Sequence, residues 1–274
     1  HANLALLIST SGSTGSPTLI KLSYQNLNDN CQAICETLAL KSTDSVMTTL
    51  PLHYSFGLSI VNTHLNKGTT FVLNEFGMLT REFWQTFKQY NIRCLYGVPY
   101  NYQMLLKLNL SRLSLASLRF FAVAGGKLLP EQVSQINEWC LVHNKLFFVM
   151  YGQTEATARI SILSPDKTQS KPYSIGQAIS GGKLWLEAIE TANNEDSSQK
   201  IGELCYSGNN IMMGVADSIT DLNVFEQEGV LHTGDLATCD KDGDYQIVGR
   251  LKRFIKIVGQ RISLDEVELF FSKQ

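Results

Sequence analysis

Several features that define whole classes of protein are missing from this sequence of 274 residues. A net charge of −2 argues against a nucleic-acid-binding surface that works through bulk positive charge, so we expect no nucleic-acid partner. No apolar run is long enough to span a bilayer and no signal peptide is visible, so no membrane span is expected. The six cysteines include no Cys-x-x-Cys pair, which favours a reduced, cytoplasmic location. Cys31 and Cys35, one helical turn apart, are interpreted as apolar filler.

A loop near the start of the chain lacks the lysine of a Walker-type phosphate loop. Gly15 is followed by Ser16 and Pro17, where that motif needs lysine and then serine or threonine. An unrelated phosphate-binding α/β enzyme, such as a kinase, is therefore disfavoured. No Ser-His-Asp arrangement for nucleophilic catalysis is recognisable either.

The loop does contain glycine, serine and threonine, and nothing else. It follows the apolar run Leu4–Ile8, which predicts a buried strand. Backbone N–H groups and hydroxyls suit phosphate oxygens, and glycine lets the main chain approach an anion closely. A flexible surface connector is the alternative interpretation. The candidate phosphate-binding residues are Thr10, Ser11, Gly12, Ser13, Thr14 and Gly15.

The rest of the chain predicts an α/β fold. Its composition, 44% apolar and 18% charged, allows a core in one large domain or two smaller ones. Up to about residue 160, predicted strands alternate with predicted helices, which is typical of a largely parallel sheet with helices on both faces. The predicted strands cover 46–52, 69–73, 94–99, 118–124 and 146–150. The predicted helices cover 23–40, a segment ending at 65, 83–90, 102–108 and 130–143.

After about residue 160 the segments shorten and glycines separate them, which predicts a β-rich subdomain. Residues 193–200 are polar and predict a surface hairpin loop. A basic stretch, 250–253, leads into a predicted strand over 254–258 and a helix from Leu264. The chain begins at His1 and goes straight into a strand, so we expect a fragment of a longer enzyme.

Four separated motifs occur in one order along the chain. They are Thr10–Gly15, Tyr151–Glu155, Thr233–Asp235, and Gly249-Arg250 with Ile255-Lys256. Together they resemble the adenylate-forming superfamily of acyl-CoA synthetases, luciferases and peptide-synthetase adenylation domains. Segments 50–58, 147–150 and 151–159 look most similar to AMP-dependent acyl-CoA ligase-type proteins, including those found beside exosortase systems.

This resemblance implies a reaction and a domain plan. ATP would activate a small-molecule carboxylic acid to acyl-AMP with Mg²⁺, and the acyl group would then pass to the thiol of coenzyme A or of an acyl-carrier protein, as in fatty acid metabolism. Residues 1–160 would form the α/β part of a large nucleotide-binding domain and 161–249 its β-rich subdomain. Residues 250–274 would form the hinge and the beginning of a truncated C-terminal lid.

The resemblance also assigns the phosphate and metal contacts. The Thr10–Gly15 loop would hold the β- and γ-phosphates of ATP. Thr154 would bond the α-phosphate and Glu155 would help to hold Mg²⁺, a hard cation suited to carboxylate oxygen. These two are the candidate catalytic residues, since two anions must meet and their repulsion must be offset. Glu155 could instead be a helix N-terminal residue favoured by the dipole.

The nucleoside contacts follow in the same way. Tyr151 would stack on the adenine, with Gly152 allowing close approach, and Asp235 would accept hydrogen bonds from both ribose hydroxyls. Arg250 would lie near the ribose and phosphate. Asp235 could instead be a turn residue after a glycine. The backbone segment lining the adenine would be Gly125, Gly126 and Lys127, and the hinge would be Lys252, unless that residue simply belongs to a solvated basic stretch.

The sequence departs from the family pattern after the phosphate loop. Where the family usually continues Pro-Lys-Gly, this chain has Pro17-Thr18-Leu19, so a cation near the phosphates is missing or is replaced by Lys21. The chain also stops before the position of the family's catalytic lid lysine. A catalytically incomplete or degenerate nucleotide-binding module is therefore the second hypothesis, and we expect this fragment alone to be inactive.

The substrate pocket is predicted to contain His53, Tyr54 and Gly57. Peptide-synthetase domains that take α-amino acids usually carry an aspartate at the position we align with Gly57, where it pairs the ammonium. A buried ammonium without a partner is costly, so an acyl or aryl carboxylic acid fits better. Tyr54 could instead be a core aromatic and His53 a structural histidine. The run Asp240–Asp244 lacks the glutamate that closes an EF-hand loop and predicts a hairpin turn.

Overall fold

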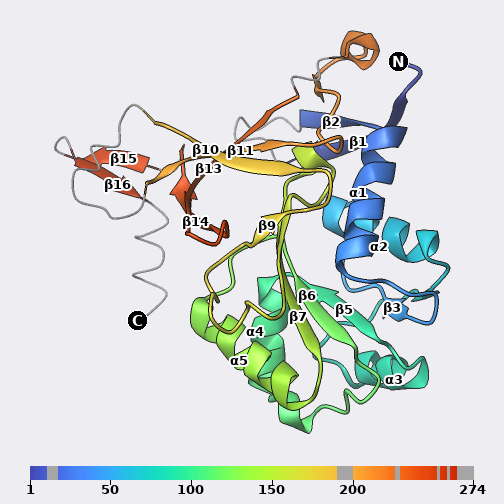
Figure 1. The fold of residues 1–274 in the computed structure, drawn as a ribbon. Coiled ribbons are helices and arrows are strands. Elements are labelled where there is room, and N and C mark those ends of the chain that lie inside the picture. The colour runs from blue at the N-terminus through green and yellow to red at the C-terminus, as the bar shows by residue number, and fades with distance from the viewer. Residues whose placement is uncertain (11–17, 190–199, 226–228, 252–253, 258–259, 264–274) are drawn as a thin grey trace.

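The computed structural model describes residues 1–10, 18–189, 200–225, 229–251, 254–257 and 260–263. They form a seven-stranded sheet, two smaller antiparallel sheets of three and four strands, and the separate β15–β16 pair (Figure 1). The α/β fold with a largely parallel sheet and a β-rich part is thus confirmed. None of the helices in the described ranges has the length and apolar character of a membrane span.

The large sheet has the strand order β4-β3-β5-β6-β7-β8-β9. Its first five strands are parallel and are linked through helices, whereas β8 and β9 extend it antiparallel. The strands are β3 (Ser45–Met47), β4 (Thr70–Val72), β5 (Cys94–Gly97), β6 (Phe120–Val123), β7 (Leu146–Tyr151), β8 (Ser161–Leu163) and β9 (Gln177–Ala178).

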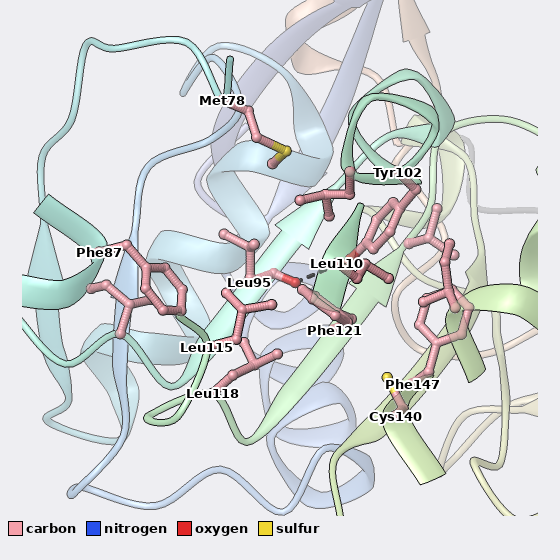
Figure 2. Packing of buried hydrophobic residues seen from close by; sticks show 14 of the residues in the cluster. Met78, Phe87, Leu95, Tyr102, Leu110, Leu115, Leu118, Phe121, Cys140 and Phe147 are labelled. Carbon is pink, nitrogen blue, oxygen red and sulfur yellow. Dashed lines mark hydrogen bonds between the residues drawn. The ribbon is translucent and has the colours of Figure 1, made fainter. Parts of the chain in front are cut away.

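Helices cover both faces of this sheet, as predicted (Figure 1). Period-two alternation divides the strand residues between two cores: Phe121 packs with the side of α3, α4 and α5, and Phe120 with the side of α1 and α2. Figure 2 shows Phe121 and Phe147 packed near Tyr102, whose hydroxyl donates to the Leu95 carbonyl at 3.1 Å. The helices are α1 (Tyr24–Thr37), α2 (Ser55–Asn66), α3 (Arg81–Gln89), α4 (Pro99–Leu108) and α5 (Pro130–Val142).

The first strand, β1 (Leu4–Thr10), lies outside the large sheet. It pairs antiparallel with β2 (Thr18–Ser23), which in turn pairs with β12 (Val215–Ala216). Only Ile8 of β1 is buried, so the strand was predicted correctly but its full burial was not. The sequence did not predict β2, whose last residue, Ser23, caps α1 by accepting from the Asn26 N–H.

The strand predicted over 46–52 ends earlier, at Met47. The next residue, Thr48, still donates its N–H to Val72, but its side chain and backbone also bond Asn74, so the chain turns away from the sheet. Pro51 has no N–H to continue a ladder. Residues 48–54 therefore form a connection that leads into α2.

The β-rich part contains the four-stranded antiparallel sheet β10-β11-β13-β14. The predicted hairpin turn at Asp240–Asp244 joins β13 to β14, and Oδ1 of Asp240 accepts from the N–H groups of Asp242 and Asp244. The predicted strand near 254 is confirmed as β15 (Phe254–Ile257), paired with β16 (Gln260–Ser263). The predicted helix from Leu264 and most of the loop at 193–200 lie outside the described residues. The sheet's strands are β10 (Lys183–Glu187), β11 (Gly202–Ser207), β13 (Leu231–Cys239) and β14 (Tyr245–Arg250).

Candidate functional site

The candidate site forms where the end of β7 meets β13. Tyr151, the last residue of β7, donates its hydroxyl to Oδ2 of Asp235 at 2.6 Å. Gln153 donates to the same oxygen at 3.0 Å and to the Thr233 carbonyl at 2.9 Å. Burial, followed by the neighbouring Asp235 carboxylate, raises the pKa of Tyr151 above its ordinary value, so the phenol remains a donor at neutral pH.

Asp235 also makes a cross-strand ion pair with Arg250. The two residues are register partners on β13 and β14, and Nε of Arg250 lies 2.7 Å from Oδ1 of Asp235. Asp235 is 2% exposed, whereas the Arg250 side chain is 59% exposed. A carboxylate offers about four acceptor positions, and these contacts already use three. Accepting from two further hydroxyls therefore requires the exposed arginine to move.

Gly152 is required by close packing of the motif on itself. A Cβ at this position would overlap the carbonyl oxygen of Ala158, so any larger residue must displace backbone. The loop is also closed at its base, since the Ile160 N–H donates to the Tyr151 carbonyl at 2.9 Å. The prediction was that Gly152 allows a close approach to adenine. The approach that the structure describes is to the motif's own backbone.

The same loop is held from outside by Asn210. Its side-chain amide donates to the carbonyls of Ala156 and Arg159 at 2.8 and 3.0 Å, and its Oδ1 accepts from Tyr206. Thr157, a β-branched residue with a φ of 66°, donates its hydroxyl to the Asn210 carbonyl at 2.7 Å. A positive φ is unfavourable for a β-branched residue, so these contacts hold a strained turn in place.

Thr154 and Glu155 form the short 3₁₀ turn Thr154–Ala156 at the centre of this loop. The Thr154 hydroxyl lies 3.2 Å from that of Ser55, the first residue of α2. The Glu155 carboxylate has neither an ion pair nor a hydrogen bond with any residue in the described part of the chain. A single half-buried carboxylate fits Mg²⁺, which commonly takes one or two protein carboxylates beside substrate phosphates.

The strands that carry the predicted phosphate loop are connected to this turn. The Met212 N–H donates to the Glu155 carbonyl at 2.8 Å, and the next residue, Met213, donates to the Lys21 carbonyl on β2. Thr10 is the last residue of β1, and its hydroxyl lies 3.5 Å from the Thr18 carbonyl. The loop residues Ser11, Gly12, Ser13, Thr14 and Gly15 lie outside the described residues, as does Lys252.

Lys21 does not serve as the replacement phosphate cation that the sequence suggested. Its residue is fully buried, and Nζ donates to the carbonyls of Asp221 and Val224 at 2.7 and 2.9 Å. Burial of an ammonium requires such acceptors. The structure therefore corrects that expectation: Lys21 ties β2 to the 3₁₀ turn Thr220–Asn223.

The predicted substrate-pocket residues lie at the start of α2. The Tyr54 hydroxyl would be 2.6 Å from a Cβ built on Gly125, so this tyrosine approaches the exposed Gly125–Lys127 segment after β6. Gly57 is buried, and a Cβ there would overlap the Pro51 carbonyl oxygen. Packing alone thus disfavours an aspartate at position 57. His53 is exposed, and no hydrogen bond joins it to other described residues.

Arg159 is a buried cation behind the site. Its guanidinium carbon lies 4.0 Å from the centroid of the Phe56 ring, and Nε lies 3.4 Å from the sulfur of Met150. Nη1 has no hydrogen-bond partner among the described residues, and burial lowers the pKa of Arg159 to about 10. The group remains charged at neutral pH, and the aromatic face compensates part of the cost of burying it.

The structure therefore brings some of the predicted site residues into contact, and it also places residues without a predicted role at the site. Tyr151 is hydrogen-bonded to Asp235 and Arg250 forms an ion pair with it, whereas no hydrogen bond links Lys127 to another residue in the described ranges. Gln153 was part of a recognised motif but had no predicted role. Asn210 had no sequence signal, because its partners are 51 and 54 positions away.

Comparison with protein families identifies the family to which the chain belongs. Residues 1–215 match the model of the AMP-binding enzyme family. The chain therefore belongs to the AMP-binding, adenylate-forming family, as the motif order predicted.

Its relatives include several acid–CoA ligases. The oxalate–CoA ligase of Arabidopsis thaliana is 29% identical over 269 residues, which cover 96% of this chain and 51% of that enzyme. A long-chain-fatty-acid–CoA ligase of Salmonella typhimurium is 26% identical over 97% of this chain and 47% of its own length. The chain thus spans about half the length of these relatives.

The fold matches solved structures of O-succinylbenzoate coenzyme A synthetase from Bacillus subtilis. The complex of that enzyme with AMP superposes with a TM-score of 0.82 at 24% identity, over 99% of this chain and 54% of the enzyme. Its complex with ATP and a magnesium ion gives a TM-score of 0.80 at 24% identity, over 97% and 54% of the two chains. At this identity the likeness establishes the fold alone.

Proposed function

We propose that the whole protein is an AMP-forming acid–thiol ligase and that this chain contributes most of its nucleotide site. ATP and a carboxylic acid would give acyl-AMP and pyrophosphate, and a thiol would then take the acyl group. The observation that carries this proposal is the cluster of Tyr151, Gln153, Asp235 and Arg250, joined by hydrogen bonds and one ion pair, beside the Thr154–Glu155 turn. Family membership and the acid–CoA ligase relatives support it.

In this proposal the nucleoside binds at the Asp235 carboxylate. The buried acid accepts from a ribose hydroxyl, and Arg250 swings out to free a further acceptor position and meets the phosphate. Tyr151 offers its ring to the adenine while its hydroxyl keeps Asp235 oriented. The backbone of Gly125, Gly126 and Lys127 lines the far side of the base.

The phosphates lie between the Thr10–Gly15 loop and the Thr154–Glu155 turn. Thr154 donates its hydroxyl to the α-phosphate, with Ser55 holding that hydroxyl from behind. Glu155 supplies the carboxylate ligand for Mg²⁺, which would offset charge as two anions approach each other. Lys252 acts as the hinge to a lid beginning in residues 250–274, and residues 1–160 and 161–249 form the two parts of the large domain.

The substrate is proposed to be an acyl or aryl carboxylic acid bound near His53, Tyr54 and Gly57. Gly57 leaves no room for a carboxylate that could pair an α-ammonium, which supports an acid without that group. The acceptor is coenzyme A, as in the acid–CoA ligase relatives, or a carrier-protein thiol. We place the reaction in the cytoplasm and in acyl or fatty acid metabolism, and six free cysteines support a reducing compartment.

Calorimetric titration of AMP into the chain tests the nucleotide site. Asp235→Ala removes the proposed ribose acceptor and should weaken AMP binding by at least about tenfold, since a hydrogen bond to a charged group is worth about 1.5–3 kcal/mol. Asp217→Ala, which changes an exposed aspartate, is the matched control and should bind like the parent chain. Equal affinity of the parent and Asp235→Ala would contradict the proposed ribose contact.

A nucleotide-binding module without catalysis is the second candidate. It is favoured by Thr18 in place of the usual lysine after the phosphate loop and by the commitment of Lys21 to two carbonyls. Pyrophosphate release by the full-length gene product, assayed with a broad panel of carboxylic acids, separates the two. AMP binding without pyrophosphate release for any acid would favour the nucleotide-binding module without catalysis.

A further inference from the structure

A second cluster of chemically reactive side chains lies on the four-stranded sheet. Glu187 comes from β10, Cys205 from β11 and His232 from β13, three strands that lie side by side (Figure 1). One ligand atom from each lies within 4.8 Å of the others. Glu203, also on β11, places Oε2 3.4 Å from Nδ1 of His232.

The donor spacing suits a tetrahedral metal ion. Zn²⁺ binds N, O and S donors at about 2.0–2.3 Å, which separates donor atoms by about 3.3–3.8 Å in a tetrahedron. From Nδ1 of His232, the distance is 3.6 Å to Sγ of Cys205 and 3.9 Å to Oε2 of Glu187. The thiol, imidazole and carboxylate together favour a borderline-soft divalent ion such as Zn²⁺ over Mg²⁺ or Ca²⁺.

Each carboxylate in the cluster is oriented by a second hydrogen bond. Trp185 donates its indole N–H to Oε1 of Glu187 at 3.2 Å, and the Gly234 N–H donates to Oε1 of Glu203 at 3.1 Å. In both residues the other oxygen, Oε2, is the one close to His232. Outer contacts of this kind fix ligand orientation in metal sites.

The charge at this cluster is not balanced by a basic side chain. In the described ranges neither Glu187 nor Glu203 forms an ion pair with lysine or arginine, and His232 is the only ionic neighbour that they have there. Burial, followed by the charges of these two glutamates, raises the pKa of Cys205 to about 12. A thiol with a raised pKa is mostly protonated at neutral pH, which disfavours a Cys–His nucleophile at this cluster.

The contrast with the sheet's other acidic cluster is informative. Asp240, Asp242 and Asp244 also bring carboxylate oxygens together, but Nζ of Lys171 lies 2.7, 2.8 and 2.5 Å from them. Lys167 adds a contact to Asp244 at 2.9 Å. Ammonium groups thus already fill that cluster, so it carries no metal proposal.

We propose that Glu187, Cys205 and His232 form a Zn²⁺ site that joins β10, β11 and β13. The fourth position is taken by water or by Oε2 of Glu203. Binding would release the thiol proton, and the resulting thiolate, imidazole and carboxylate would hold the ion. Because His232 lies three residues before Asp235 on β13, the ion would also brace the strand that presents that carboxylate.

Metal titration of the chain, stripped of metal with a chelator, tests this site. Co²⁺ serves as the spectroscopic probe, because a thiolate ligand gives it a charge-transfer band in the near ultraviolet. Competition with Zn²⁺ then gives affinity and stoichiometry. We expect one Zn²⁺ per chain, and Cys205→Ser should abolish the band and weaken Zn²⁺ by about 100-fold or more.

Two controls and two further variants make the result decisive. Cys239→Ser, at a partly exposed thiol on the same sheet, and Asp242→Asn, in the lysine-filled cluster, should leave the band and the affinity unchanged. Because Cys205 is buried, circular dichroism in chelator must show that its variant is folded. If the Cys205→Ser variant is not folded, the test uses His232→Gln and Glu187→Gln instead, because these two ligands are half-exposed. Retention of the band and of tight binding in the folded variants, or no band in the parent chain, would overturn the proposal.

Discussion

The hydroxyl of Tyr151 donates a hydrogen bond of 2.6 Å to Oδ2 of Asp235, a residue 84 positions later in the chain. This contact joins the large sheet to the four-stranded sheet at the candidate site. Gln153 binds the same oxygen and Arg250 binds the other one. Asp235 is therefore held in place from three sides before any ligand arrives, which reduces the ordering cost of binding.

Tyr151→Phe keeps the ring that is proposed to stack on adenine and removes only the hydroxyl. Asp235 would then be held by Gln153 and Arg250 alone. This hydrogen bond exists before AMP binds, so its loss acts through the cost of ordering the carboxylate on binding, about 0.5–1.5 kcal/mol, and AMP affinity measured by calorimetry should fall by about two- to tenfold. Tyr90→Phe, which changes an exposed tyrosine beyond α3, should bind AMP like the parent chain.

The outcome of Tyr151→Phe separates two roles of this residue. Unchanged AMP affinity in Tyr151→Phe, together with a loss in Asp235→Ala, would show that the hydroxyl does not position the carboxylate. The ribose contact itself would still stand. Unchanged affinity in both variants would instead contradict the nucleotide site.

The parallel sheet could be predicted from the sequence because its signals are local. Runs such as Phe120–Val123 and Leu146–Tyr151 are apolar on both faces, and each is preceded by a helical pattern. The motif order also predicted that Tyr151, Asp235 and Arg250 share one site, and the structure brings these three together.

The parts that were missed depend on contacts between distant segments. β2 is a strand because Ile20 pairs with Ile8 on one side and with Val215 on the other. Nothing in the residues around Ile20 indicates that second partner. In the same way, the sequence around Asn210 indicates only an ordinary loop residue, because its partners, the carbonyls of Ala156 and Arg159, come close only in the folded chain.

Gly152→Ala tests the close packing of the 151–160 loop independently of any ligand. The added methyl would overlap the Ala158 carbonyl oxygen, so backbone must shift. Overpacking of this kind costs about 1–3 kcal/mol, which urea unfolding should show as a lower midpoint. Gly77→Ala, where a Cβ meets open space, is the control and should change the midpoint little. Equal midpoints would mean that the loop can relax without cost.

Asp44→Asn tests a buried ion pair at the amino ends of the parallel strands, away from the candidate site at their carboxyl ends. Asp44 is 1% exposed, and Arg119 binds both of its oxygens, at 2.9 and 2.7 Å. Burial alone would raise the pKa of Asp44, but the arginine hydrogen bonds hold it below its ordinary value. Removing one partner of such a pair costs about 3–5 kcal/mol.

Urea unfolding at pH 7 measures the loss caused by Asp44→Asn. Asp217→Asn, at an exposed aspartate, is the control and should cost less than about 0.5 kcal/mol. A loss no larger than the control's would show that Arg119 finds a different acceptor or solvent when the carboxylate is gone.

His64 should make the folded protein less stable in mild acid. The imidazole is fully buried between the hydroxyls of Thr69 and Tyr96, at 2.8 and 3.0 Å. Burial lowers its pKa from 6.5 to about 4, so the unfolded chain binds a proton in this interval while the folded chain does not. Stability from this group is therefore present above about pH 6.5 and is lost as the pH falls toward 4, by about 2 kcal/mol between pH 7 and pH 5.

The measurement is the free energy of unfolding in urea from pH 7 to pH 5, compared with His64→Gln. Glutamine can still hydrogen-bond but does not titrate, so its curve should fall by about 2 kcal/mol less than that of the parent over this range. His143→Gln, at an exposed histidine, should leave the parent slope unchanged. Parallel curves for the parent and His64→Gln would mean that the folded chain protonates His64 as readily as the unfolded chain. The buried pair with Tyr96 would then have to open in mild acid.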